Sequence, residues 1–210
     1  MKIAIMGAGN VGATLGKGWA AKGYEIAFGV RDPKDTKVQE VVKAAGGKAR
    51  AMGIKDAAAY GEEVVLATPW PAVKEVIKAA GDLKGKILID ATNPLKHDLS
   101  GLAIGHTTSA GEEVSHWATG AKVVKAFNTI GSLHMANPRF GGQSASMFLC
   151  GDDAGAKATV SMLAEVLGFE PVDAGPLTQA RLLEPLAMLW ISMALSYGQG
   201  PNIAFKLLRR

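Results

Sequence analysis

The chain has 210 residues, of which 48% are hydrophobic and 20% are charged. This length and composition fit a single folded α/β domain and exclude a disordered or low-complexity protein. The formal net charge is +4 without a dense basic run, so we expect acidic small molecules rather than nucleic acid as partners.

The single cysteine, Cys150, excludes an intramolecular disulfide and a thiolate metal cluster. The four histidines show no metal-ligand spacing, so we expect no metal site. The apolar run before Gly7 is too short for a signal peptide, and the run at 186–195 is too short to span a bilayer. These features predict a soluble, cytoplasmic protein that does not contact a membrane.

The most informative stretch begins at residue 3. An apolar run at 3–6 is followed by Gly7-Ala8-Gly9-Asn10-Val11-Gly12, and Leu15 and Trp19 continue the helical spacing that starts at Val11. A strand, a glycine-rich loop and a helix in this order are typical of the opening of a dinucleotide-binding βαβ unit.

Each glycine of this loop has a separate expected role. Gly7 makes the tight turn, Gly9 lets the backbone approach a pyrophosphate, and Gly12 lets the helix pack close to the strand. The N-terminus of the helix presents free N–H groups and a partial positive charge to the phosphates. We therefore predict that the whole loop, Ala8, Asn10 and Val11 included, holds a dinucleotide cofactor.

The second predicted strand, at 24–30, ends in Val30 and is followed by Arg31. In NAD-binding units a carboxylate at this tip accepts hydrogen bonds from the adenosine ribose and repels a 2′-phosphate. The guanidinium of Arg31 instead suits a 2′-phosphate in charge and in its planar fork of donors. We therefore predict NADP(H) rather than NAD(H), held in part by Val30, Arg31 and Lys34. Asp32 is the alternative ribose contact, and a solvated surface position is the alternative for Lys34.

The rest of the chain alternates between apolar runs and helical patterns. We predict further strands at 48–52, 63–67, 86–91, 122–127, 146–151 and 169–173, and helices at 36–45, 72–80, from Ser109 onward, 153–167 and 177–195. This pattern predicts an α/β, Rossmann-like, doubly wound and mostly parallel sheet with a small C-terminal helical extension. Residues 1–177 are the expected NADP-binding domain. Residues 178–210 are the expected helical segment that completes the substrate site and the dimer contact.

Two strand tips carry further candidate residues, because ligands bind at the carboxyl ends of strands in such sheets. The strand at 63–67 ends in Thr68-Pro69-Trp70, and the strand at 86–91 is followed by Asn93. Trp70 is a candidate wall of the nicotinamide site, with core packing as an equal alternative. Asn93 offers an amide donor and acceptor, with a turn-forming role before Pro94 as the alternative.

The last predicted helix is apolar on both faces and contains Pro185, which is expected to kink or restart it. A helix that is apolar all round needs cover on more than one side. We therefore predict a homodimer, with burial inside the monomer as the alternative.

Five stretches carry a resemblance to a known family: Gly7-Ala8-Gly9-Asn10-Val11-Gly12, Gly29-Val30-Arg31, Ala67-Thr68-Pro69-Trp70, Lys125-Ala126-Phe127-Asn128-Thr129-Ile130 and Asp173-Ala174-Gly175-Pro176-Leu177. In this order they resemble the coenzyme F420-dependent NADP oxidoreductase family over nearly the whole chain. Its members move a hydride between NADP(H) and an 8-hydroxy-5-deazaflavin that is held face to face with the nicotinamide. The pair Phe127-Asn128 is also similar to the reductase domain of STEAP metalloreductases, which pass electrons from NADPH to a flavin.

The resemblance implies roles for individual residues. The loop from Gly7 to Gly12 would hold the pyrophosphate and Arg31 the 2′-phosphate, while Thr68, Pro69 and Asn93 would border the nicotinamide. The residues implied to face the second substrate are Asn128, Thr129, Ile130, Pro176 and Leu177.

Hydride transfer between stacked rings requires that the donor and acceptor carbons be held about 3 to 3.5 Å apart, and it requires no side-chain nucleophile. We therefore assign no catalytic side chain. The leading hypothesis is an oxidoreductase that moves a hydride between NADPH and F420 or a flavin such as FMN or FAD. A reductase of a small carbonyl or imine is the second hypothesis, and it needs a proton donor near the substrate. A non-catalytic NADPH-binding redox sensor is the third.

Overall fold

The computed structural model describes residues 1–210, and its centre is one eight-stranded sheet of order β10-β9-β6-β5-β4-β1-β2-β3. The strands of this sheet are β1 (Lys2–Met6), β2 (Glu25–Val30), β3 (Ala49–Gly53), β4 (Glu63–Leu66), β5 (Ile87–Asp90), β6 (Lys122–Lys125), β9 (Ser146–Gly151) and β10 (Glu170–Asp173). The strands from β3 to β6 pair in parallel, while β9 pairs with β6 in antiparallel orientation. The prediction of a mostly parallel, Rossmann-like sheet is confirmed.

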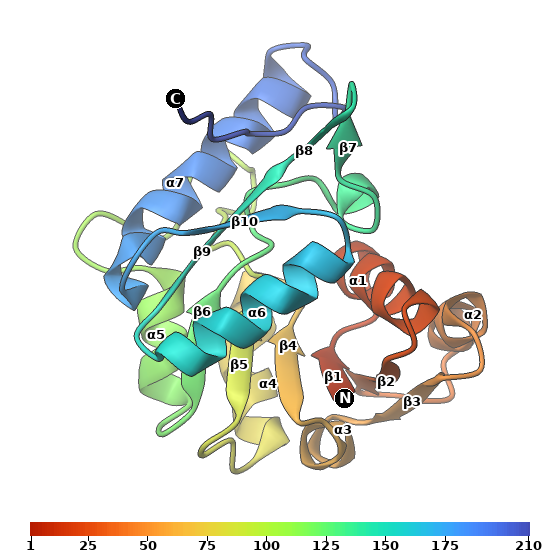
Figure 1. The fold of residues 1–210 in the computed structure, drawn as a ribbon. Helices are drawn as coiled ribbons and strands as arrows, with labels where there is room; N and C mark the ends of the chain where they lie inside the picture. The colour runs from red at the N-terminus through yellow and green to blue at the C-terminus, as the bar shows by residue number, and fades with distance from the viewer.

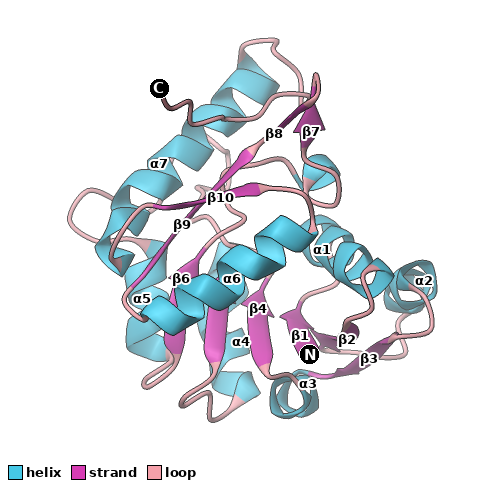
Figure 2. Ribbon diagram, in the orientation of Figure 1, coloured by secondary structure: helices cyan, strands magenta, loops and turns pink.

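Helices cover both faces of the sheet (Figure 1; Figure 2). They are α1 (Asn10–Ala21), α2 (Thr36–Ala45), α3 (Ile54–Tyr60), α4 (Val73–Ala80), α5 (Ala110–Trp117), α6 (Ala154–Val166) and α7 (Ala180–Ile191). Because both faces are covered, the central strands are buried on both sides, which explains their nearly continuous apolar sequences. No helix of the chain combines the length and apolar character that a membrane span requires.

Trp19 joins the two helices in front of the sheet. It is fully buried on α1, its Nε1 donates a hydrogen bond to the Leu163 carbonyl of α6 at 3.0 Å, and its ring packs edge-on against Phe127 at 5.6 Å. Phe127 follows β6 directly, so this contact fixes the helices relative to the strand tips where ligands bind.

Three features of the fold differ from the sequence-based expectation. Helix α3 has only seven residues, too few for the amphipathic spacing to stand out. A short hairpin, β7 (Arg139–Phe140) with β8 (Gln143–Ser144), precedes β9. Strands β9 and β10 run opposite to the rest, so the segment that follows β10 leads back along the sheet and not outward from the carboxyl ends of β4, β5 and β6.

The C-terminal helix also differs from its predicted limits. A 3-10 turn (Leu177–Gln179) precedes α7, and a π-helical turn (Ser192–Ser196) follows it. Pro185 lies inside α7 without ending it, so of the two predicted effects the restart is wrong and the kink stays a prediction. Leu183, Ala187 and Trp190 face the core. Large side chains on the other side of the segment remain exposed: Leu182 at 65%, Leu189 at 51% and Leu195 at 64%.

Candidate functional site

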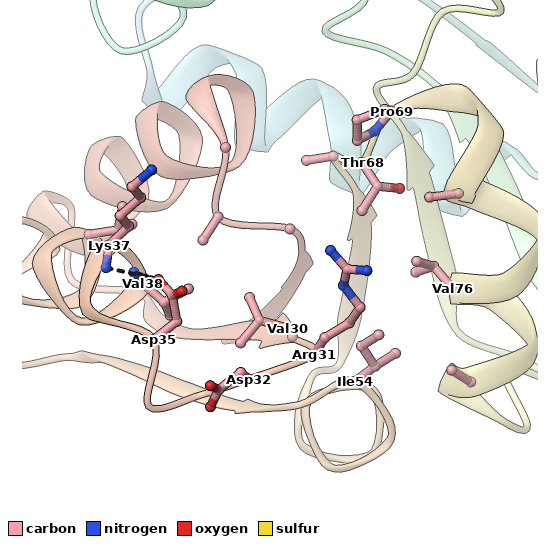
Figure 3. A pocket seen from close by; sticks show the side chains of 18 of the residues that line it. Val30, Arg31, Asp32, Asp35, Lys37, Val38, Ile54, Thr68, Pro69 and Val76 are labelled. Atoms are coloured by element: carbon pink, nitrogen blue, oxygen red, sulfur yellow. Dashed lines mark hydrogen bonds between the residues drawn. The ribbon is translucent and has the colours of Figure 1, made fainter.

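A cleft of about 900 Å³ opens at the carboxyl ends of β1, β2 and β4 (Figure 3). Seven of the predicted cofactor residues line it: Gly7, Ala8, Gly9, Val30, Arg31, Thr68 and Pro69. Its other walls are largely apolar and come from α2, α3 and α4. The structure therefore brings the glycine loop, the tip of β2 and the tip of β4 together around one elongated space, as a bound dinucleotide requires.

The glycines of the loop are needed for different reasons. Gly7 has φ +115°, and a Cβ there would lie 2.6 Å from the Ala67 carbonyl oxygen. At Gly12 a Cβ would lie 2.2 Å from the Gly7 carbonyl oxygen, so this glycine sets the close approach of α1. At Gly9 a Cβ would meet no protein atom within 4 Å. No contact within the chain therefore requires a glycine at this position, and the space beside Gly9 is open to a ligand in the cleft.

This contrast predicts that replacing Gly12 or Gly9 by alanine impairs different properties, stability in the first case and cofactor binding in the second. Gly12→Ala should destabilise the fold by about 1 to 3 kcal/mol, because the added methyl overlaps the backbone of the loop. Gly9→Ala should leave the unfolding midpoint nearly unchanged but weaken NADPH binding about tenfold or more, because its methyl occupies cleft space. Thermal unfolding and NADPH fluorescence titration of both variants test this. Equal losses of stability in the two variants would contradict the assignment of Gly9 to ligand binding.

Helix α1 begins at Asn10 directly behind this loop. No side chain caps the helix, and its first turn contains no acidic residue. The N–H groups of the first turn therefore remain available to an anion, as predicted from the sequence. Asn10 and Val11 do not line the cleft, and their place in the first turn of α1 leaves only their backbone N–H groups as possible ligand contacts.

Arg31 and Asp32 both line the cleft, and Arg31 extends toward Thr68, whereas Asp32 points in a different direction (Figure 3). The guanidinium is exposed and forms no hydrogen bond or ion pair with the chain. The carboxylate of Asp32 accepts the Lys34 backbone N–H at 2.9 Å, so it stabilises its own turn. This arrangement favours Arg31 over Asp32 as the contact to the adenosine ribose and its phosphate.

Beyond the start of α1, three predicted cofactor residues do not line the cleft: Lys34, Trp70 and Asn93. The basic side chain that lines the cleft beyond Arg31 is Lys37, on α2, rather than Lys34. Trp70 stacks on Trp117 with ring centroids 5.4 Å apart, which matches the packing alternative. Thr68, by contrast, lines the cleft, and its Oγ1 is buried without a partner in the chain. A buried hydroxyl without a partner is costly, which makes Thr68 a candidate ligand contact.

The next two strand tips are joined by a pair of amides. The Nδ2 of Asn93 donates to the Asn128 carbonyl oxygen at 3.0 Å, and the Nδ2 of Asn128 donates to the Asn93 Oδ1 at 3.1 Å. Asn128, Thr129 and Ile130 are buried, whereas Asn93 is only half-buried. Asn93 is therefore the member of this pair that a ligand can reach.

A second cavity of about 600 Å³ lies between the 102–108 segment and α7, where Pro185 and Met188 form its wall. Both walls are connected to the Asn93–Asn128 pair. The segment is tied to the tip of β5 by the Ala103 N–H, which donates to the Pro94 carbonyl at 2.6 Å, and Pro185 lies two residues after Leu183, whose carbonyl accepts from Asn128. The cavity is thus positioned beside the tips of β5 and β6.

None of the predicted substrate residues lines either cavity: Asn128, Thr129 and Ile130 are buried after β6, and Pro176 and Leu177 lie further away, after β10. Leu177 is buried in the core behind the sheet, and its N–H donates to Asp152 at 2.9 Å. Pro176 and Leu177 line neither cavity, because the chain turns after β10 onto the face of the sheet that α5 covers, where the Leu177 carbonyl oxygen lies beside Cys150. Cys150 is likewise buried, and burial raises the pKa of its thiol to about 12, as expected for an inert core residue.

Comparison with known proteins agrees with this geometry. The model of the family described as NADP oxidoreductase coenzyme F420-dependent matches residues 2–94. The F420-dependent NADP reductase of Methanothermobacter marburgensis is 30% identical over 207 residues, covering 92% of this chain and 92% of that protein. The chain belongs to the coenzyme F420-dependent NADP oxidoreductase family. It is therefore an NADP-dependent oxidoreductase.

Other relatives show how far the likeness to this family extends. A structure from Arthrobacter sp. FB24, provisionally described as an F420-dependent NADP-reductase, has a TM-score of 0.91 at 35% identity, and the two chains cover each other completely. The metalloreductase STEAP3 of Rattus norvegicus is 31% identical over 90% of this chain, which spans only 37% of that protein. A reductive aminase from Aspergillus terreus in complex with NADPH has a TM-score of 0.70 at 20% identity, which shows a shared fold alone.

Proposed function

We propose that the protein transfers a hydride between NADP(H) in the cleft and a planar deazaflavin, F420, or a related flavin in the second cavity. The observation that carries this proposal is the placement of the two cavities along one edge of the sheet: the cleft lies at the tip of β4, and the second cavity lies beside the tips of the next strands, β5 and β6. When bound, the reduced nicotinamide supplies the hydride. The chain itself binds the two partners, orients them and excludes water.

Three regions of the cleft and its rim fit the pyrophosphate, the 2′-phosphate and the nicotinamide of NADP(H). The uncapped N-terminus of α1 and the open space above Gly9 suit the pyrophosphate, and the unpaired Arg31 suits the 2′-phosphate. Thr68 and Pro69 at the tip of β4, with Asn93 at the neighbouring tip of β5, would then border the nicotinamide. F420 as the acceptor is supported by the family name and by the M. marburgensis relative. A flavin is supported by the likeness to a metalloreductase.

The test is anaerobic oxidation of NADPH with F420, FMN, FAD and a panel of small carbonyls and imines. We expect turnover with F420 or a flavin and none with the panel. A carbonyl or imine reductase remains the second candidate, because His106 lines the second cavity and is a residue type that supplies a proton. Turnover with carbonyls or imines alone would refute the proposal. Tight NADPH binding without any turnover would support a redox sensor instead.

We also propose that the protein is a homodimer in which the exposed side of α7 faces a second copy. Leu182, Leu189 and Leu195 provide the apolar surface that a partner would cover. Light scattering coupled to gel filtration should give twice the mass of one chain for the wild type. The variant Leu189→Glu should shift this mass toward the monomer, and a monomeric wild type would contradict the proposal.

A further inference from the structure

Three charged side chains are completely buried behind the amide pair: Asp90 at the end of β5, Lys125 at the end of β6, and Glu184 on α7. The Nζ of Lys125 lies 2.8 Å from the Asp90 Oδ2, 2.9 Å from the Glu184 Oε1 and 2.7 Å from the Thr92 carbonyl oxygen. Each of its three protons thus has an acceptor. We call these three side chains the buried charge cluster.

The first N–H groups of α5 bind one of the two carboxylates of the buried charge cluster, that of Glu184. The Glu184 carboxylate accepts the backbone N–H groups of Ala110 and Gly111 at 2.9 and 3.0 Å. The Asp90 Oδ1 accepts the N–H and the hydroxyl of Thr92 at 2.9 and 2.7 Å. Replacing a buried ion pair by apolar side chains of similar size is often neutral or stabilising. The buried charge cluster is therefore a candidate for a role beyond stability.

Each member of the cluster is closely linked to the amide pair. Asn93 follows Asp90 by three residues, and Asn128 follows Lys125 by three residues. Glu184 follows Leu183, whose carbonyl oxygen accepts the second Nδ2 proton of Asn128 at 3.1 Å. Turning the Asn128 amide over would place its oxygen against two other acceptors, so the cluster and its neighbours hold this amide in one orientation.

The backbone between Lys125 and Asn128 is also held in an unfavourable conformation. Phe127 has φ +62°, which is uncommon for a bulky residue, although its ring is fully buried. Such strain persists only where the surroundings fix it, and it occurs often at functional sites. Here it turns the chain so that the carbonyl oxygen of Asn128 meets Asn93.

The half-buried Asn93 is left with one free donor and one free acceptor. Its amide carries two N–H groups and two acceptor positions, of which the contacts with Asn128 use one each. Asn93 does not line the cleft itself. It follows β5, whose carboxyl end lies beside that of β4, where Pro69 lines the cleft. One free N–H and one free acceptor position are the hydrogen-bonding groups that a primary carboxamide, such as the one on the nicotinamide ring, can pair with.

We propose that the buried charge cluster is a positioning device that orients Asn93, through Asn128, to hold the carboxamide of the nicotinamide. The cluster residues are positioning residues and touch neither ring. This inference rests on the proposed binding of NADP(H) in the cleft. It predicts that the protein distinguishes a carboxamide from a group that cannot donate hydrogen bonds.

The test compares dissociation constants for NADP⁺ and its 3-acetylpyridine analogue, in which a methyl group replaces the amide nitrogen. Competition with NADPH fluorescence gives both values. The wild type should bind NADP⁺ about three- to tenfold more tightly than the analogue. Asn93→Ala should bring this ratio close to one, and so should Glu184→Gln. Because Glu184 acts through Asn93, the double variant should show no further change.

Glu63→Gln is the matched control, since Glu63 is a buried glutamate at the opposite end of β4 and should leave the ratio unchanged. If Glu184→Gln is not recovered folded, Asp90→Asn replaces it, because this variant neutralises the other carboxylate that pairs with Lys125. An unchanged ratio in Asn93→Ala, or in a folded cluster variant, would overturn the inference. Adenosine 2′,5′-bisphosphate lacks the nicotinamide and should bind the wild type and all variants equally. Its failure to bind the wild type would instead refute the cofactor site itself.

Discussion

Replacing Arg31 by alanine should raise the dissociation constant of NADP(H) by about 10- to 100-fold and change that of NAD(H) by less than about twofold. The guanidinium extends into the cleft and has no partner in the chain, so removing it leaves no buried group unsatisfied (Figure 3). The loss therefore reports on the 2′-phosphate alone, which only NADP(H) carries. Arg31→Lys should give an intermediate value, because lysine keeps the charge but loses the planar fork.

Lys34→Ala is the control for this experiment. Lys34 is an exposed basic residue three positions further along the same loop, and it does not line the cleft. Its removal should change both dissociation constants by less than about twofold. Isothermal titration of each variant with both cofactors measures the effect. A parallel loss of NADP(H) and NAD(H) affinity in Arg31→Ala would refute the role of Arg31 in recognising the phosphate.

Replacing Lys125 by methionine should destabilise the fold by about 3 to 5 kcal/mol, because Asp90 and Glu184 would remain buried without their common cation. Burial by itself lowers the pKa of Lys125, but the two carboxylates outweigh this effect and raise the pKa above its usual value. The lysine is therefore charged in the folded protein at neutral pH. Such a loss is a large share of the roughly 5 to 15 kcal/mol that stabilises a typical domain.

Lys122→Met on the same strand is the matched control. Lys122 pairs with Asp153 at 3.0 Å, but both side chains are partly exposed, so this pair should contribute at most about 1 kcal/mol. Chemical denaturation of both variants gives the two free energies of unfolding. Similar values for Lys125→Met and Lys122→Met would contradict the importance assigned to the buried charge cluster.

The cofactor half of the site was predictable because its determinants are local. Gly7, Gly9 and Gly12 act within one strand, turn and helix, and Arg31 follows the next strand directly. The pattern of apolar runs likewise predicted the sheet. Lys34 was assigned in place of Lys37 because spacing along a loop does not determine which side chain turns into a cleft.

The other half of the site depends on contacts between distant segments. The amide pair joins residues 35 apart in the sequence, and Glu184 reaches Ala110 across 74 residues. The placement of Pro176 and Leu177 depended on the reversed direction of β9 and β10, which strand composition does not reveal. One signal was available in the sequence, since Lys125 and Glu184 each interrupt an apolar stretch. Charges of opposite sign in such places indicate a buried pair.

The central claim is direct hydride transfer from the nicotinamide to a planar acceptor without a catalytic side chain. The most direct measurement follows deuterium from C4 of NADPH, labelled on either face in separate reactions, into F420 under anaerobic conditions. We expect one of the two labelled forms to deliver its deuterium to C5 of the deazaflavin, where a carbon–hydrogen bond retains it. Reduction of F420 with the deuterium of both forms lost to water, or no reduction of F420 or of a flavin, would contradict the account.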